Sequence, residues 1–205
     1  MFQDLSLMEF SEQLASATPT PGGGSAAAVA GVMAASLVQM VAALTKGKKG
    51  YEEWEALMEE TTCRMAEKRQ KLLQQINKDA KAFEGVMQAI QMPKETADEK
   101  QDRKAALQKA LIHATEVPLE TARKAVRIGL SALDMAKWGN KNAVSDAYSA
   151  LELARACFFM SLENVEINIG MIKDESFTTR IQEESEELTS QMESLIQQSL
   201  ELKTS

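Results

Sequence analysis

One aspartate lies where the pattern of a predicted helix requires an apolar side chain. Asp79 comes three residues after Ile76 and four before Phe83, so it shares their face of the helix. A carboxylate on such a face loses hydration, which raises its pKa toward the range useful for proton transfer. Asp79 is therefore the candidate general acid or base. The alternative, which spacing alone favours, is a structural aspartate held at the core edge by an Arg or Lys side chain.

A glycine-rich loop leads directly into another predicted helix. The segment from Pro19 to Ser25 reads Pro-Thr-Pro-Gly-Gly-Gly-Ser, and Ser25 is placed to cap the alanine-rich helix that follows. Glycines let the backbone approach a ligand closely, and a helix N-terminus offers unpaired N–H groups to an anionic or carbonyl oxygen. The loop is not a P-loop, because the Lys-Ser/Thr pair after the last glycine is missing. Contact with a ligand or with a close helix is favoured over an ordinary turn.

Two groups of polar side chains in the C-terminal half have both a functional and a structural explanation. Asn164 and Asn168 lie one helical turn apart on a half-buried face, where two amides can hold a heterocycle or cross-link helices. Asn140, Ser145 and Asp146 lie together at the junction that precedes this helix. Helix capping is the simpler explanation for that second group.

The charge balance argues against a nucleic-acid-binding surface. The net charge is −7, and no basic block is longer than Lys46-Gly47-Lys48-Lys49. Lys46, Lys48 and Lys49 could bind a ligand that carries carboxylates, although a solvated helix end is the commoner setting for such residues.

The chain is poor in residues that bind metals or act as nucleophiles. His113 is the single histidine, so the sequence has no His pair for zinc chemistry and only one base for a Ser-His or Cys-His dyad. Cys63 and Cys157 lack CxxC spacing and are expected to be reduced thiols. We predict no metal site. The N-terminus shows no secretory signal, so a cytoplasmic location is expected.

The elements that position these residues are predicted to be helices throughout. Apolar residues recur at steps of three and four, and strict alternation never coincides with hairpin turns. No repeat or long linker divides the chain, so residues 1–205 are expected to form one all-α domain. Capping boxes at Ser6 and Thr96 mark two helix starts, and Pro118 suits the first turn of another. The expected helices cover residues 6 to about 17, 25 to about 45, 51 to about 92, 96 to about 115, 118 to about 139, 142–172 and 176–203.

The helix from Ser25 to Thr45 carries no charge and is long enough to span a bilayer. Its content is mostly alanine, which gives little transfer energy, and small residues also suit the crowded centre of a helical bundle. We therefore interpret it as a buried helix of a protein without a membrane span.

The last predicted helix repeats an apolar residue every seven positions, from Ile181 through Leu188 and Leu195 to Leu202. This spacing predicts packing against another helix. Long helices with wide apolar stripes often pair across a two-fold axis, so a homodimer is the preferred expectation and a monomeric bundle the alternative.

Taken together, these segments resemble the cyclodeaminase/cyclohydrolase family of folate enzymes, which includes the C-terminal domain of formiminotransferase-cyclodeaminase. The resemblance extends from Phe10 to about Asp174. Any one of the motifs is weak, but their order along the chain is specific. They are residues 19–25, 40–45, 47–51, 79–83, 92–94, 117–119, 139–142, 145–146 and 164–168.

The resemblance implies an all-helical homodimer with its active site in a cleft near the two-fold axis. It assigns the family's catalytic acid/base to Asp79, the residue that periodicity marks as out of place. It also implies a substrate pocket, without a metal or cofactor, for a tetrahydrofolate derivative whose glutamate tail the lysines would hold. The implied pocket residues are Pro21, Gly22, Gly23, Gly24, Ser25, Lys46, Lys48, Lys49, Asn140, Ser145, Asp146, Asn164 and Asn168.

The resemblance leaves the reaction open. The first choice is a formiminotetrahydrofolate cyclodeaminase, which closes 5-formiminotetrahydrofolate to the 5,10-methenyl compound and releases ammonia. The alternative is a methenyltetrahydrofolate cyclohydrolase, which opens the methenyl compound to 10-formyltetrahydrofolate, and the absence of an attached transferase domain favours it. A third hypothesis is a helical scaffold without catalysis, suggested by the acidic run Glu183 to Glu187 on the last helix.

Overall fold

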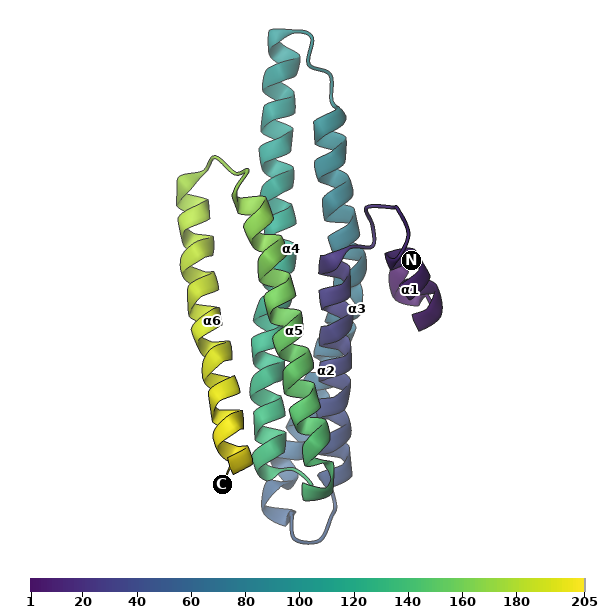
Figure 1. Cartoon of the computed structure of the whole chain (residues 1–205), viewed down its shortest axis with the longest axis vertical. Coiled ribbons are helices and arrows are strands. Elements are labelled where there is room, and N and C mark those ends of the chain that lie inside the picture. Colours follow the sequence, from purple (N-terminus) through teal and green to yellow (C-terminus); the bar gives the residue numbers. More distant parts are fainter. Residues whose placement is uncertain (205) are drawn as a thin grey trace.

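The computed structural model describes residues 1–204, and within that range the chain forms helices and connecting segments with no strand. The all-α prediction is confirmed. Four long helices run side by side, and a fifth packs on the outside of the bundle (Figure 1). In chain order the elements are the short turn η1 (Phe2–Asp4), α1 (Leu7–Leu14), α2 (Gly23–Thr45), the short turn η2 (Glu52–Trp54), α3 (Glu55–Gln91), α4 (Ala97–Trp138), the short turn η3 (Lys141–Ala143), α5 (Val144–Ile169) and α6 (Glu175–Thr204).

The alanine-rich helix α2 packs against three helices, namely α3, α4 and α5. Its glycine Gly31 lies at a close approach to α3 and α5, because a Cβ there would be 2.9 Å from Cys157 Sγ and 3.1 Å from Leu72 Cδ1. Within residues 1–204, α2 is the one helix long and apolar enough to cross a membrane. Its packing agrees with the interpretation as a bundle helix, because small side chains allow the neighbouring backbones to come this close.

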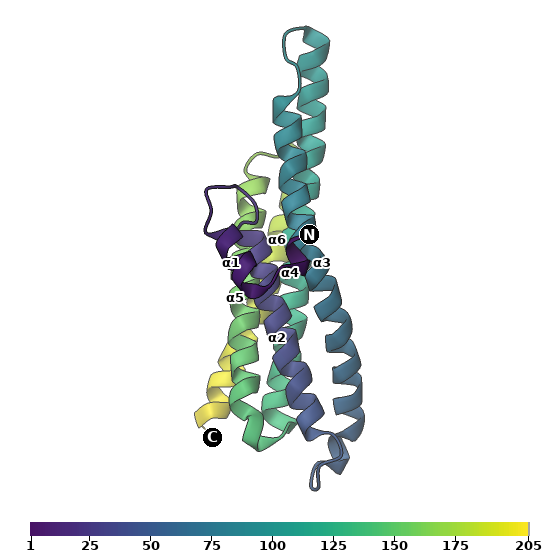
Figure 2. The same cartoon turned by 90° about the vertical axis from the view of Figure 1, so that its right-hand side faces the viewer.

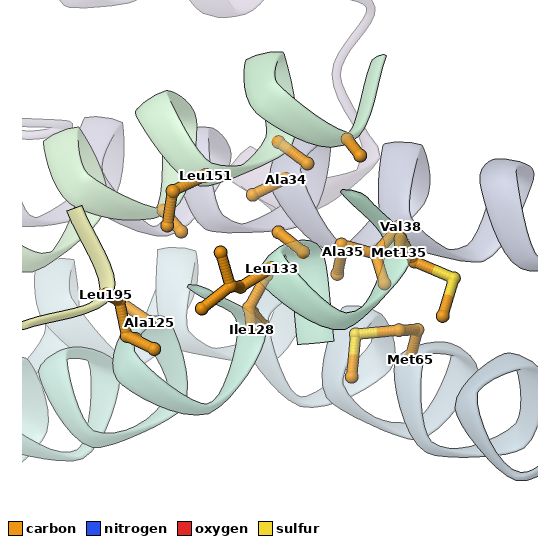
Figure 3. Packing of buried hydrophobic residues seen from close by; sticks show 14 of the residues in the cluster. Ala34, Ala35, Val38, Met65, Ala125, Ile128, Leu133, Met135, Leu151 and Leu195 are labelled. Carbon is orange, nitrogen blue, oxygen red and sulfur yellow. The ribbon is translucent and has the colours of Figure 1, made fainter. Parts of the chain in front are cut away.

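The main core lies between the five long helices. Figure 3 shows side chains from all of them meeting in one layer, among them Val38 of α2, Met65 of α3, Leu133 of α4, Leu151 of α5 and Leu195 of α6. The predicted packing of the last helix is confirmed, because Leu195 is buried against Gly129 of α4, whose hypothetical Cβ would be 3.3 Å from Leu195 Cδ1. The α6 stripe therefore covers α4.

The region around Pro118 differs from the sequence prediction. Two helices were expected, one ending near Thr115 and one beginning at Pro118, but α4 is continuous from Ala97 to Trp138. Proline has no N–H for the carbonyl four residues earlier, which is that of Ala114. The side chain of Asn168 supplies a donor in its place, with Nδ2 at 2.8 Å from the Ala114 oxygen. A side chain from another helix thus lets α4 pass through a residue that normally ends a helix.

The C-terminal part of α3 and the N-terminal part of α4 extend together beyond the other helices (Figures 1 and 2). We call this extension, residues 80–113, the arm. The apolar stripe predicted on α3 is buried at Leu72 and Ile76 but exposed at Phe83, Met87 and Ile90. The reason is that α2 begins beside Asp79. It therefore covers the part of α3 that precedes Asp79 and leaves the part that follows Asp79 uncovered.

Several helix ends also test the sequence analysis. Both capping boxes are confirmed, at Ser6 with Glu9 and at Thr96 with Glu99. The first helix ends at Leu14 rather than near Ala17. Residues 15–18, which follow Leu14, are all exposed and bury no side chain that would stabilise another turn.

Candidate active site

A cavity of about 300 Å³ lies at the base of the arm, where α2 begins beside α3 and faces the C-terminal part of α5. The loop before α2 closes one side of it. Its walls are formed by Pro19, Thr20, Gly22, Gly23, Gly24, Asp79, Ala82, Phe83, Val86, Ala114, Asn164, Ile167, Asn168 and Met171. The structure therefore brings Asp79, the glycines and both asparagines of α5 into one site.

Asp79 faces the first turn of α2. The Ser25 hydroxyl lies 2.9 Å from Asp79 Oδ2 and 3.1 Å from the carbonyl oxygen of Ile76, and it can donate to either. The backbone N–H of Ser25 also donates to the Asp79 carboxyl. The predicted capping role of Ser25 is wrong, because the N-cap of α2 is Gly22, which has no side chain to offer. The Asp79 carboxylate supplies from α3 the acceptor that this helix start lacks.

Gly24 is required for this arrangement. A Cβ at Gly24 would lie 2.1 Å from Asp79 Oδ1 and 2.6 Å from Asp79 Cγ, which no pair of real atoms tolerates. At the neighbouring Gly23, a Cβ would meet Asn164 Nδ2 at 3.6 Å, an ordinary contact. The close approach predicted for the glycine loop is thus made to a catalytic candidate, and it depends on one of the three glycines.

Burial raises the pKa of the Asp79 carboxyl above its ordinary value, and the two hydrogen bonds from Ser25 oppose this rise in part. No ion pair joins Asp79 to a Lys or Arg side chain within residues 1–204. The alternative explanation, a structural aspartate held by a Lys or Arg side chain, is therefore not supported. A partly desolvated carboxyl with a raised pKa is suited to both accepting and returning a proton.

The two asparagines of α5 line the cavity opposite the start of α2. Asn164 Nδ2 donates to the Met160 carbonyl at 2.8 Å, and Asn168 Nδ2 donates to the Asn164 carbonyl at 2.9 Å. The bond from Asn168 to Ala114 joins α5 to α4. Asn168 therefore cross-links two helices, as one of the two explanations predicts, whereas the side chain of Asn164 bonds within α5; both residues also line the cavity.

One wall of the cavity is apolar and was not identified from the sequence as part of a site. Phe83, Ile167 and Met171 line it while remaining 38%, 67% and 52% exposed. Such a wall suits the face of a ring system. The signal available in the sequence was the run of apolar residues continuing past Asp79 on α3, which periodicity assigns to the core.

The remaining predicted pocket residues lie at the opposite end of α2. This helix has 23 residues and is about 34 Å long, so Lys46, Lys48 and Lys49 are far from Asp79 within one chain. Lys46 forms an ion pair with Glu59, and Lys48 Nζ lies 2.9 Å from Asn140 Oδ1.

Asn140 at this end has a clear structural role. Its side chain caps η3 by accepting from the Asn142 N–H at 3.1 Å, and it donates to the Leu44 carbonyl at 3.2 Å. Ser145 is exposed and Asp146 lies in the first turn of α5. Asn140, Ser145 and Asp146 therefore do not reach the Asp79 cavity of their own chain, because an entire helix separates the two ends of the bundle.

Comparison with known proteins identifies the family. The model of the formiminotransferase-cyclodeaminase family matches residues 6–187. The chain belongs to this family. Within residues 1–204, no group of three or more His, Cys, Asp or Glu side chains is arranged to hold a metal ion. The Asp79 cavity of this family member is lined by one carboxyl, two amides, a helix start and an apolar wall.

Relatives of two kinds are similar to this member of the formiminotransferase-cyclodeaminase family. A methenyltetrahydrofolate cyclohydrolase from Methylorubrum extorquens is 42% identical over 82% of the chain and 81% of that protein. The formimidoyltransferase-cyclodeaminase of Sus scrofa is 31% identical over 86% of the chain, which spans only 33% of that longer protein. A solved formiminotetrahydrofolate cyclodeaminase from Thermotoga maritima is 38% identical, with a TM-score of 0.90 over 98% of this chain and 97% of that one.

Proposed function

We propose that this protein is a methenyltetrahydrofolate cyclohydrolase with Asp79 as its acid/base. The observation that carries the proposal is the 42% identity to a cyclohydrolase matched over most of both chains. The first choice from the sequence was the cyclodeaminase, and the comparisons give the alternative the stronger support. The half-buried Asp79 carboxyl, with its raised pKa, supplies the one proton-transfer group that the reaction needs.

In the proposed reaction, water attacks the carbon that bridges N5 and N10 of the methenyl compound. The Asp79 carboxylate accepts a proton from the attacking water, which leaves a neutral tetrahedral carbon bearing a hydroxyl. The protonated Asp79 then returns the proton to N5 as the bond between that carbon and N5 breaks. The hydroxyl loses its proton to solvent and becomes the formyl carbonyl on N10, so one proton is released per turnover.

The cyclodeaminase remains the second candidate, because the Thermotoga maritima structure that matches nearly the whole chain carries that name. In that reaction N10 attacks the formimino carbon of 5-formiminotetrahydrofolate. The formimino group enters in its protonated form, with two hydrogens on its nitrogen; Asp79 would accept the N10 proton and pass it to this nitrogen, which departs as ammonia and leaves the methenyl cation. Both reactions pass through a tetrahedral carbon between the same two nitrogens, so the same site serves either.

The two candidates are separated by giving the purified protein each substrate alone. We expect loss of methenyl absorbance faster than in the protein-free control, and no ammonia from 5-formiminotetrahydrofolate. Ammonia release at a comparable rate would assign the cyclodeaminase instead. The Asp79→Asn variant controls for trace contaminants, since it should be inactive in whichever assay the wild type is active. If the protein showed neither activity and did not bind tetrahydrofolate, the hypothesis of a helical scaffold without catalysis would be favoured.

We further propose that two chains pair through α2. On α2, Met33, Met40 and Leu44 are 39% to 51% exposed, and Leu37, which is half-buried at the edge of the main core, continues their line along the helix. We call these four residues the α2 stripe. Their spacing of three and four places them on one face of the helix, and Figure 2 shows α2 itself on the outside of the bundle. An apolar stripe of this kind is typical of a helix that pairs with another helix.

An antiparallel pairing of two α2 helices would also explain the separation of the predicted site residues. A two-fold axis through the middle of α2, near the Met33 end of the stripe, sets the end of one α2 beside the start of the other. The partner's Lys46, Lys48 and Lys49 would then approach the Asp79 cavity and reach the glutamate tail of a folate, including a polyglutamate. The lysines and Asp79 would belong to one site made by two chains.

This shared site predicts complementation, at substrate concentrations below the variant's KM, between an inactive variant and one that binds substrate weakly. Asp79→Asn lacks the acid/base, and Lys48→Glu should raise the KM for the folate substrate by removing a cation from the partner's site. Mixed dimers of the two variants contain one site with neither change, so a statistical mixture should recover about a quarter of wild-type activity. No recovery after unfolding and refolding the mixture would contradict the shared site, and the Asp79 mechanism would be unaffected.

A further inference from the structure

Pro118 creates a gap in the hydrogen bonding of α4 that faces the cavity. The helix is continuous through Pro118, so the carbonyl of Ala114 has no N–H four residues further along to accept from. Asn168 fills this gap from α5, with Nδ2 at 2.8 Å from the Ala114 oxygen. Asn168 and Ala114 both line the cavity that contains Asp79.

The two hydrogen bonds of Asn168 fix which way its amide faces. Nδ2 donates to the Ala114 carbonyl at 2.8 Å and to the Asn164 carbonyl at 2.9 Å. Both partners are carbonyl oxygens, so the nitrogen of the amide and not its oxygen must face them. An amide nitrogen carries two hydrogens, and both are used. Asn168 can therefore offer a ligand only its Oδ1, as an acceptor.

Asn164 is different. Its Nδ2 has a single carbonyl partner, that of Met160 at 2.8 Å, so its amide retains an N–H as well as an acceptor for a ligand. The two asparagines that line the cavity are consequently not equivalent, although the sequence presents them as a matched pair one turn apart.

We propose that Asn168 determines substrate specificity by accepting a hydrogen bond from a ring N–H of the substrate, and that Pro118 is the residue that fixes it in this role. The proposal rests on the function proposed above, since reduced pterins carry N–H donors on their pyrimidine edge. With an alanine at position 118, the new N–H would bond the Ala114 carbonyl, and the amide of Asn168 would no longer be held by α4. A ligand with only acceptors on that edge would find no partner at Asn168.

A double-mutant cycle separates the link to α4 from the contact with substrate. It compares the wild type with Pro118→Ala, Asn168→Ala and the double variant, measuring the melting temperature, kcat and KM for 5,10-methenyltetrahydrofolate. Asn168→Ala should lower the melting temperature by several degrees in the wild type and by less than half as much in the Pro118→Ala background. Asn168→Ala should raise the KM about tenfold in the wild-type background and by less in the Pro118→Ala background, where the amide is no longer held by α4, with kcat within about threefold in both.

The outcomes are distinct. Equal melting penalties in the two backgrounds would overturn the link between Pro118 and Asn168. A KM restored to the wild-type value in the double variant would overturn the substrate contact, because Asn168 would then act only through α4. If Asn168→Ala alone does not fold, the comparison of Pro118→Ala with the double variant still gives the KM result. Absence of tetrahydrofolate binding to the wild type in calorimetry would instead refute the proposed function, and the melting cycle would remain informative.

Discussion

At the scale of single residues, Asp79 has two roles that point in opposite directions for stability. It accepts hydrogen bonds from Ser25 at the start of α2, yet burial raises its pKa, which means that folding disfavours its charged form. A carboxyl with a raised pKa contributes stability that is present below its unfolded pKa and lost as the pH rises through its folded pKa.

Asp79→Asn tests this balance. Turnover should fall by about two to four powers of ten, the usual contribution of one acid/base group. The melting temperature near neutral pH should be unchanged or higher, because the amide removes the buried charge and still accepts from Ser25. This advantage should shrink below the ordinary pKa of aspartate, where the wild-type carboxyl is protonated in both states. Full turnover of Asp79→Asn together with a lowered melting temperature would instead show that Asp79 has a structural role.

The substitution Ser25→Ala is expected to change the pH dependence of kcat/KM. The hydrogen bonds from Ser25 stabilise the charged carboxylate and so oppose the effect of burial on the Asp79 pKa. Removing the hydroxyl should raise this pKa further. If Asp79 acts as a base, the acidic limb of the kcat/KM profile should move to higher pH in the variant. An unmoved limb would assign it to another group.

The two neighbouring glycines provide a matched pair of substitutions. Gly24→Ala places a Cβ 2.1 Å from Asp79 Oδ1, so α2 or the carboxyl must move, and activity should fall at least a hundredfold with a lower melting temperature. Gly23→Ala makes only a 3.6 Å contact with Asn164 Nδ2 and should keep most of the stability. Equal effects of the two alanines would show that loop flexibility, not close approach, is what the glycines provide.

At the scale of elements, the arm is the part of the chain whose helix ends depend most on local capping. The Thr96 hydroxyl accepts from the Glu99 N–H at 3.2 Å, and Glu99 Oε2 accepts from the Thr96 N–H at 2.9 Å. A small cluster of Ala82, Val86, Leu111, Ala114 and Val117 joins its two helices. Within residues 1–204, no other long helix extends to the tip of this pair (Figures 1 and 2).

Thr96→Ala should therefore destabilise the arm more than the site. Loss of an N-cap lowers the free energy of unfolding by about 1 kcal/mol. Amide exchange should quicken in the first turns of α4, whereas turnover should stay within twofold because the cavity lies at the base of the arm. Ser6→Ala removes the equivalent cap from the short helix α1 and is the control for a cap outside the arm. A large loss of turnover in Thr96→Ala would mean that the arm tip takes part in the reaction.

At the scale of the whole molecule, substitutions in the α2 stripe test whether the protein is a dimer or a monomer. Leu44 on α2 and Leu200 on α6 are each 51% exposed, so they form a matched pair. Leu44→Glu places a charge in the proposed contact and should shift sedimentation at micromolar concentration from dimer to monomer. Leu200→Glu should leave the wild-type state unchanged. A wild-type monomer under the same conditions would refute the dimer altogether.

The sequence by itself determined the helical class, most helix boundaries and the identity of Asp79 as an unusual residue. These properties are local, since they depend on the spacing of apolar residues and on capping boxes that lie within four positions. The exposed Phe83, Met87 and Ile90 show the limit of this reasoning. Periodicity assigns a face to each side chain, but only the position at which α2 begins decides where that face is covered.

Tertiary structure alone decided the partners of Asp79 and the course of α4 through Pro118. Ser25 and Asp79 are 54 positions apart, as are Ala114 and Asn168, so no spacing rule relates them. A proline normally predicts a helix boundary because its own chain cannot replace the missing hydrogen bond. Here another helix supplies the donor, and such long-range compensation exists only once the bundle has brought α4 and α5 into contact.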